Sequence, residues 1–298
     1  MIIYRFCEKE IKVNTTNHQF QPLLSPWRQI VCLIFTGLAL VGCNFLAAAP
    51  TPKPVIKPDV VLKTSGSGSV TAVLAAIAPD FEAATPSYHL NVLSGTDTGG
   101  GVKGVAQGVL DVAAMSRALK DEEAAQNVKY LEYGRAGVAT FSHPGVGVAN
   151  LTADQLKAIF SGQITTWDKV GGPKEPIIVF VRDEADSSAK AMHDTFMGDT
   201  PYISGAQILN SQGDMLKAVE TTNYSIGYGT WPVALAKQSK VAAIKIDGIG
   251  PDDPAYPMLS PQGIGYLSTR EAEVKPLLDW LLSPQGKESL HKLAIVTP

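Results

Sequence analysis

The sequence predicts an α/β fold with largely parallel sheets, and two patterns lead to this prediction. Short apolar runs typical of strands alternate along the chain with runs whose apolar residues recur at helical spacing. Clusters of Ser, Thr and Gly stand where these strands end and the next helices begin. Alternation of this kind is typical of parallel strands joined by crossover helices.

The N-terminal region predicts export from the cytoplasm. Ile30–Gly42 is an uncharged apolar run of thirteen residues that follows Arg28, too short to span a bilayer comfortably. We interpret residues 1–42 as a signal peptide. Leu40–Cys43 resembles the lipobox of bacterial lipoproteins, which predicts cleavage before Cys43 and a lipid on its thiol. The alternative is an uncleaved membrane anchor, and either arrangement places the rest of the chain outside the cytoplasmic membrane.

Composition limits what the remainder of the chain can be. All three cysteines lie at or before Cys43, so no disulfide is expected after it. Residues 43–59 contain four prolines, which favours an extended tether. The remaining length suits one large or two modest domains. The formal net charge of −3 argues against nucleic acid as a partner.

The elements follow from apolar spacing and from the turn residues that bound them. Five runs are expected to be strands: 60–65, 88–94, 111–116, 176–181 and 225–230. Four further segments are expected to be helical: the apolar run that follows the small residues of 65–69, and 151–160, 187–196 and 213–221. Residues 277–293 predict helices around a break at Pro284.

Four polar loops repeat one theme at the ends of the predicted strands. They are SGSGS (65–69), SGTDTGGG (94–101), SR (116–117) and RDEADSS (182–188). Any one of them is explained by helix capping and turn chemistry alone. The carboxyl ends of parallel strands meet at one edge of a sheet, however, so four such loops together predict a binding crevice.

The chemistry of these loops suits a small anion. Each helix start presents unpaired N–H groups and the positive end of a dipole. Arg117 or Arg182 is expected to neutralise charge, and hydroxyl donors are available at Ser69, Thr98, Ser116, Ser187 and Ser188. We further expect that Gly66, Gly68 and Ser69 are small so that backbone N–H groups can touch the anion directly.

Several segments together resemble a known family. They are GSGSV before the first helix, 98–123, LKAIFSGQITTWDKVGG within 151–172, and SIGYGTW at 225–231. In order and spacing they are similar to the phosphate-type periplasmic binding proteins of ABC transporters. The third segment is the most specific, and its Ile159, Phe160 and Trp167 are expected to be structural.

The resemblance implies a type II periplasmic-binding-protein fold. Two lobes, each a mainly parallel sheet flanked by helices, would be joined by two hinge crossings and would close on a dehydrated oxyanion. Lobe 1 would comprise residues 60–137 and 246–298, and lobe 2 residues 138–245. The helices of 277–293 are expected to pack on lobe 1.

The resemblance also implies which residues contact the ligand. They are Gly68, Ser69 and Val70 in the first loop, Thr98 and Gly99 in the second, Ser116 and Arg117 in the third, and Arg182, Asp186, Ser187 and Ser188 in the fourth. No catalytic residue, cofactor or metal is expected.

The fourth loop departs from the family pattern. Ala185-Asp186-Ser187-Ser188 stands where the family has Gly-Ser-Gly-Thr, and Asp186 would repel a dianion if it pointed inward. Two roles for Asp186 remain open. It accepts the ligand's proton, replacing an aspartate that some relatives have at Ser116, or it is the N-cap of the following helix.

Enzymatic readings have little support. Gly99–Gly104 matches G-x-G-x-x-G, but a lone match is weak and the next strand ends in Ser116-Arg117 rather than in an acidic ribose ligand. No histidine lies in a triad motif, and no His/Cys cluster has the spacing of metal ligands.

The sequence therefore predicts a monomeric, lipid-anchored receptor in the periplasm or on the outer face of the cytoplasmic membrane. It would bind phosphate or a close oxyanion and deliver it to an ABC permease. The alternative is a binding or sensing module for another oxyanion, such as sulfate, molybdate or phosphonate, that is not coupled to transport.

Overall fold

The computed structural model describes residues 59–298. The predicted signal peptide, Cys43 and the tether up to Pro58 lie outside the described residues. Within 59–298, no helix combines the length and the apolar character needed to cross a bilayer.

The first half of the described chain is a parallel α/β unit. Its elements are β1 (Val60–Gly66), α1 (Gly68–Ala84), β2 (Tyr88–Val92), α2 (Thr98–Ala106) and β3 (Val112–Met115). β1 lies between β2 and β3 and pairs with both in parallel. The strands predicted at 60–65, 88–94 and 111–116 are confirmed.

Side chains alternate across this sheet and divide its core in two. In β3, Val112 and Ala114 belong to a cluster with α1, whereas Ala113 and Met115 face α2. The α1 cluster also holds the apolar residues of α8 (Glu271–Leu282) and α9 (Pro284–His291). The expected helices on either side of Pro284 are confirmed, with Pro284 at the start of the second, where its missing N–H costs nothing.

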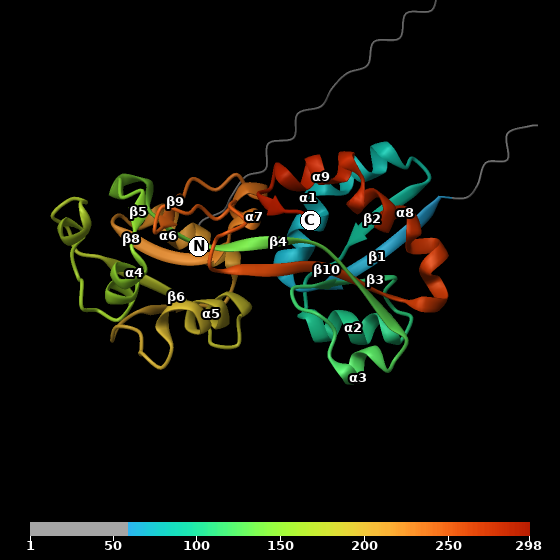
Figure 1. The fold of residues 1–298 in the computed structure, drawn as a ribbon, viewed down its shortest axis with the longest axis horizontal. Helices are drawn as coiled ribbons and strands as arrows, with labels where there is room; N and C mark the ends of the chain where they lie inside the picture. The colour runs from blue at the N-terminus through green and yellow to red at the C-terminus, as the bar shows by residue number, and fades with distance from the viewer. Residues whose placement is uncertain (1–58) are drawn as a thin grey trace, which may run out of the picture. The chain divides into compact units, whose positions relative to one another are not determined.

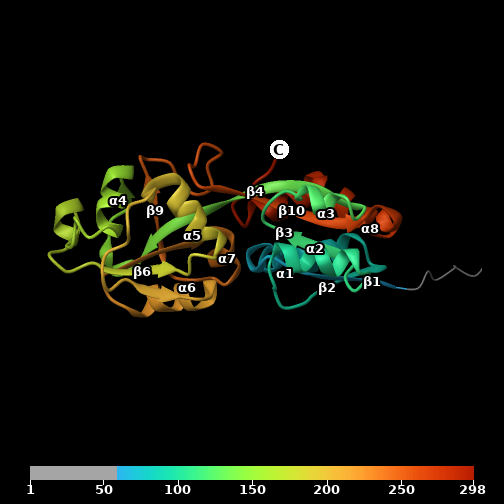
Figure 2. The same cartoon turned by 90° about the horizontal axis from the view of Figure 1, so that it is seen from below.

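A long strand, β4 (Val128–Ser142), connects the two halves of the molecule (Figures 1 and 2). Its first part pairs antiparallel with β10 (Leu259–Leu267), and its second part pairs antiparallel with β8 (Ser225–Thr230). The change of partner falls at Gly137, where a Cβ would lie 2.3 Å from the carbonyl oxygen of Pro251. Glycine at this position therefore lets the two crossing segments pack closely.

The second half is again built on parallel strands. β6 (Ile178–Arg182) pairs in parallel with β7 (Gln207–Leu209) on one side and with β8 on the other. Its helices are α4 (Ala153–Phe160), α5 (Ser187–Met192), α6 (Gln212–Thr221) and α7 (Trp231–Ala236). The predicted strands at 176–181 and 225–230 and the three predicted helices are confirmed, although the helix from Ser187 continues beyond Met192 as a π-helical turn, η3 (His193–Met197).

Alternation along β6 again assigns its side chains to two layers. Val179 and Val181 pack in a cluster with α4 and α5, whereas Phe180 packs with α6 and α7. Ile159, Phe160 and Trp167 are fully buried in the first of these clusters, as expected of structural residues.

The chain passes from one lobe to the other where its residues leave the apolar core of one half and enter that of the other. Ile246, Ile249, Tyr256 and Met258 pack in the core of the second half. The Val138 N–H donates to the carbonyl oxygen of Met258 (2.9 Å), where the two crossings lie side by side. We propose that the second crossing follows Met258 rather than lying near Ile246.

Short elements complete the fold. They are α3 (Asp121–Ala124), η1 (Pro144–Val146), β5 (Asn150–Leu151), η2 (Trp167–Val170), β9 (Ala242–Ile246), η4 (Ser268–Arg270) and β11 (Ile295–Val296). The main sheet order is β2-β1-β3-β10-β4-β8-β6-β7. Because β1, β3, β6 and β8 end toward the junction of the halves, their polar loops meet there.

Candidate functional site

The first turn of α1 offers backbone donors to the site. Thr71 is the first residue whose N–H bonds within the helix, to the Ser67 carbonyl oxygen (2.9 Å). The N–H groups of Gly68, Ser69 and Val70 have no acceptor among residues 59–298. Val70 is fully buried, whereas Gly68 and Ser69 line the cavity beside α1, so their N–H groups are the donors open to a ligand.

Gly66 and Gly68, which lie just before and at the start of this turn, are glycines for different reasons. Gly66 has φ +142°, and a Cβ there would lie 2.2 Å from the Ala114 carbonyl oxygen, so backbone geometry alone requires glycine. At Gly68 a Cβ would meet no other atom within 4 Å. The small size of Gly68 therefore has no packing explanation, which fits direct contact between this turn and a ligand.

The start of α2 holds a carboxylate of its own. The Asp97 Oδ1 accepts from the Gly100 N–H (2.5 Å) and caps the helix. Thr98 follows Asp97, and its Oγ1 accepts from the Ser116 N–H (3.2 Å) and lies 3.3 Å from the Ser116 Oγ. The second and third predicted loops are therefore joined directly.

Arg117 is engaged within its own lobe. Its Nη1 and Nη2 donate to both carboxylate oxygens of Glu123 (2.7 and 2.8 Å), and Nη1 also donates to the Ala118 carbonyl oxygen. This bidentate hydrogen bond lowers the pKa of Glu123 to about 2, against the opposing effect of burial. Arg117 thus lies beside the site with its charge already paired.

Arg182 lies at the end of β6, and its side chain is only 6% exposed. Its backbone N–H donates to the Tyr228 Oη (3.1 Å), which in turn contacts the Tyr202 Oη (3.0 Å). Its Nη2 donates to the Asp186 Oδ2 (2.6 Å), while Nε and Nη1 have no partner among the described residues. Buried N–H donors without acceptors are costly, and they mark a place where an acceptor is expected.

Asp186 links Arg182 to the start of α5. Its Oδ1 accepts from the Ser188 N–H (2.9 Å), so Asp186 is the N-cap of this helix. Burial raises the pKa of Asp186. The hydrogen bond and charge of Arg182 and the bonds to Ser188 have a larger effect in the opposite direction, so the pKa lies below its ordinary value. Ser188 is buried and Ser187 is exposed.

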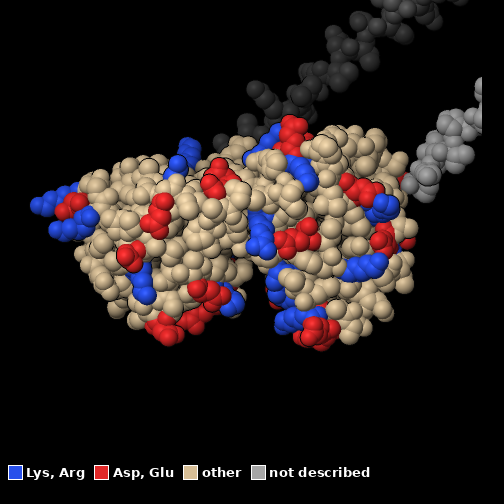
Figure 3. Space-filling model, in the orientation of Figure 1, with Lys and Arg blue, Asp and Glu red and all other residues tan. Residues whose placement is uncertain are grey.

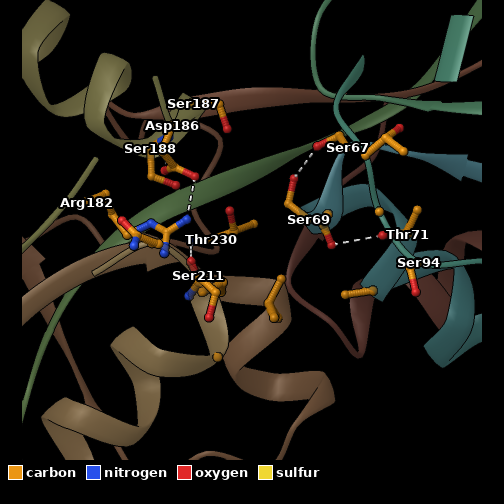
Figure 4. A pocket seen from close by; sticks show the side chains of 18 of the residues that line it. Ser67, Ser69, Thr71, Ser94, Arg182, Asp186, Ser187, Ser188, Ser211 and Thr230 are labelled. Atoms are coloured by element: carbon orange, nitrogen blue, oxygen red, sulfur yellow. Dashed lines mark hydrogen bonds and ion pairs between the residues drawn. The ribbon is translucent and has the colours of Figure 1, made fainter. Parts of the chain in front are cut away.

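Two neighbouring cavities bring these loops together. The first, of about 640 Å³, extends between α1, Arg182, α6 and α7 (Figure 4). The second, of about 860 Å³, extends between α2, Arg117, α5 and the segment 257–261. Both are lined by Ser67, Gly68, Thr96, Asp186 and Ser187. Figure 3 shows the surface hollowed between the two halves, with acidic and basic side chains on both sides.

The predicted site residues divide between the two cavities. Those on the first are Gly68, Ser69, Arg182, Asp186, Ser187 and Ser188, and those on the second are Gly68, Thr98, Gly99, Ser116, Arg117, Asp186 and Ser187. Val70 lines neither cavity. Every predicted loop therefore reaches the junction of the two halves.

The starts of α1, α5 and α6 all line the first cavity, and sequence reasoning did not predict that the start of α6 lies there. Ser211 caps α6, and Gln212, Gly213 and Thr230 line the cavity beside Arg182. The Gln212 Oε1 accepts from the Thr230 N–H (3.3 Å), which leaves its Nε2 as a buried donor without a partner among the described residues. The signal was present: Ser211 stands three residues before Asp214, a common capping pattern.

A metal has no evident place in the described part of the chain, where no three His, Cys, Asp or Glu side chains are grouped for coordination. The groups that line the first cavity include the free N–H donors of α1, several hydroxyls, Lys237 and the amide of Asn210. This arrangement accepts negatively charged oxygen.

Comparisons with known proteins place the chain among solute-binding proteins. The "Phosphate-binding protein PstS" of Bacillus subtilis is 25% identical over 236 residues, covering 77% of each chain. "Protein SphX" of Synechocystis is 26% identical over 239 residues, covering 72% of this chain and 70% of that one.

Solved structures give the same result. A putative phosphate ABC transporter substrate-binding protein from Clostridium perfringens, solved with bound phosphate, is 26% identical with a TM-score of 0.66, covering 80% of this chain and 99% of that chain. An ABC-type phosphate transport receptor from Vibrio cholerae shares the fold at 24% identity with a TM-score of 0.58, covering 80% and 100%.

The sequence profile described as "PBP superfamily domain" matches residues 49–285. This range contains both lobes up to the start of α9 and every loop of the site. The α/β fold predicted from the sequence is confirmed, and the chain belongs to the PBP superfamily.

Proposed function

We propose that this protein captures phosphate, or a closely related oxyanion, between its two lobes and delivers it to an ABC permease. Relatives named as phosphate-binding proteins align with most of the chain, and a structure solved with bound phosphate aligns with 80% of it. The proposal includes passive binding, without any chemical change of the ligand.

The single observation that carries this proposal is Arg182. A guanidinium that is 6% exposed and has two nitrogens without partners calls for an acceptor that residues 59–298 do not supply. It lines the same cavity as the free N–H groups at the start of α1, which come from the other lobe. A tetrahedral oxyanion supplies several acceptor oxygens to both sets of donors at once.

The number of donors is sufficient for useful affinity. Micromolar binding corresponds to about 8 kcal/mol. A hydrogen bond to a charged group contributes about 1.5–3 kcal/mol, so four to six such bonds reach this value before the entropy cost of association. The N–H groups of Gly68 and Ser69, together with the three N–H bonds of the Arg182 Nε and Nη1, already supply five donors.

The remaining features of the proposal come from the sequence. Cleavage before Cys43 and lipidation of its thiol would hold a monomeric receptor on the outer side of the cytoplasmic membrane, with 43–59 as a tether. Ligand contacts are proposed for the predicted residues that line the two cavities, and Val70, which is buried and lines neither, is left out of the proposal.

Isothermal titration of the full chain with phosphate, sulfate, molybdate and methylphosphonate tests the proposal. We expect saturable heat with phosphate and weaker or no heat with the other anions. Absence of heat with all four anions would overturn it.

The alternative is a sensing module for another oxyanion, and the observation that favours it is the departure of the fourth loop, Ala185-Asp186-Ser187-Ser188, from the family pattern. Tighter binding of sulfate or molybdate than of phosphate would support this alternative.

A further inference from the structure

The Arg182 guanidinium already holds an anion that belongs to the protein itself. In Figure 4 the dashed line from Arg182 ends on Asp186, and this contact joins Nη2 to Oδ2 at 2.6 Å. Nη2 is the guanidinium nitrogen that is paired, whereas Nε and Nη1 are buried without partners among the described residues. A ligand entering the first cavity therefore meets an arginine whose charge is shared with a carboxylate.

Asp186 is held firmly in this position. Its Oδ1 accepts from the Ser188 N–H, its own N–H donates to the Asp183 carbonyl oxygen (2.9 Å), and its carbonyl oxygen accepts from the Lys190 N–H (3.0 Å). Its side chain is 23% exposed and lines both cavities. The carboxylate is thus a fixed negative charge at the point where the cavities meet.

A carboxylate and a tetrahedral oxyanion make the same demand on a guanidinium. Both bind its planar N–H groups through anionic oxygens, and both are attracted by its positive charge. Two anions beside one arginine also repel each other, more strongly at a partly buried site than in open water. The carboxylate therefore competes with a ligand both for the Nη2 donor and for the charge.

We propose that Asp186 is an internal competitor of the ligand, and that it sets the affinity of the site by occupying Arg182. This inference rests on the proposed function, because it concerns anion binding in the same cleft. Asp186 acts here as a residue that tunes affinity, and it does so for any oxyanion, since the competition requires only negative charge. Its capping of α5 is the structural role that keeps it in place.

The test compares three variants by isothermal titration of the full chain with phosphate and, separately, with sulfate. Asp186→Asn removes the charge and keeps the shape, and Asp186→Ser restores the residue of the family pattern. Asn and Ser are both good N-cap residues, so α5 is expected to form in either variant. Thermal unfolding of each variant checks this.

The matched control is Asp279→Asn. Asp279 is paired with Lys275 (2.7 Å), also four residues apart on an exposed face of α8, so the net charge changes equally without any contact to the cleft.

We expect both Asp186 variants to bind phosphate about tenfold more tightly than the unaltered chain, with a similar gain for sulfate, and the control to bind unchanged. Unchanged or weaker binding in both Asp186 variants, where the unaltered chain binds phosphate, would overturn the inference and leave the proposed function intact. Weaker phosphate binding with a gain for sulfate alone would also overturn it, because that pattern identifies Asp186 as an acceptor of the ligand's proton. If no variant binds either anion, the proposed function and the inference both fail.

Discussion

Arg182 illustrates how one residue is prepared for a ligand by its surroundings. The end of a buried strand and the Tyr228 hydroxyl, which itself contacts the Tyr202 hydroxyl, fix its backbone, and burial keeps water away from most of its guanidinium. A cation in this position interacts with an anion in a less polar environment than water, where charge–charge attraction is stronger. Its contribution to binding should therefore exceed that of an exposed arginine.

Replacing Arg182 with alanine is expected to weaken phosphate binding about a hundredfold or more. At least two hydrogen bonds to a charged ligand are lost, each contributing about 1.5–3 kcal/mol. Isothermal titration measures the change. The control is Arg135→Ala, which removes the same charge from an exposed pair with Glu132 (3.0 Å). An equal loss in both variants would contradict the prediction, because net charge alone would then explain it.

Gln212 gives a second prediction at this scale. Replacing it with leucine removes the Nε2 donor of the first cavity, and phosphate affinity is expected to fall about three- to tenfold. Gln285→Leu, near the start of α9 and outside both cavities, serves as the control. If titration gives the same affinity for both variants, the Gln212 amide has only the structural role of accepting from the Thr230 N–H.

At the scale of elements, α3 is held against the third loop by the Arg117–Glu123 pair. The Glu123 side chain is 11% exposed, and its pKa of about 2 lies below the ordinary 4.5. A pKa lowered by folding stabilises the folded state fully above pH 4.5, and this stabilisation is lost as the pH falls through about 2.

Glu123→Gln is accordingly expected to lower the free energy of unfolding by about 2 kcal/mol at pH 7, allowing for screening of the partly exposed Arg117 by water. The difference from the unaltered chain should shrink at pH 3 and disappear near pH 2. Urea unfolding at these pH values measures it, with the exposed Glu122→Gln as a control that changes little. A difference that is constant with pH would show that packing, and not charge, is responsible.

The elements differ in how well local sequence predicts them. Strands such as Ser225–Thr230 were predictable because turn residues bound them and their side chains are buried throughout. β4 was not predicted, because it continues through Gly134 and Gly137 and pairs with different strands in its two parts. β10 contains Pro261, which weakens its strand pattern. Long-range pairing determines both strands, and local periodicity does not report it.

The candidate site shows the same limit. The polar loops were predictable from composition, since strand ends and helix caps have local signatures. The sequence alone left two roles open for Asp186, because the side-chain geometry that joins it to Arg182 depends on the folded loop. Gln212 comes from a helix whose start reaches the cavity only through the parallel pairing of β6 with β7.

At the scale of the whole molecule, ligand contacts on two lobes imply a change in their separation. The first cavity, at about 640 Å³, is in the range that suits a drug-sized molecule rather than a small tetrahedral ion. Simultaneous contact of one phosphate with the start of α1 and with Arg182 therefore requires the lobes to approach each other. The two crossings, at Val138 and Met258, are the place where such a rotation is expected.

Small-angle X-ray scattering of the full chain is expected to give a smaller radius of gyration in saturating phosphate than in its absence. The physical reason is that closure allows donors from both lobes to share one anion and excludes water from between them. Arg182→Ala at the same phosphate concentration should keep the larger radius, because the second lobe loses its main attraction for the ligand. If calorimetry detects saturable phosphate binding while the radius stays constant, the ligand is held by one lobe alone. In that case the donors of α1 and the guanidinium of Arg182 do not act on the same ion.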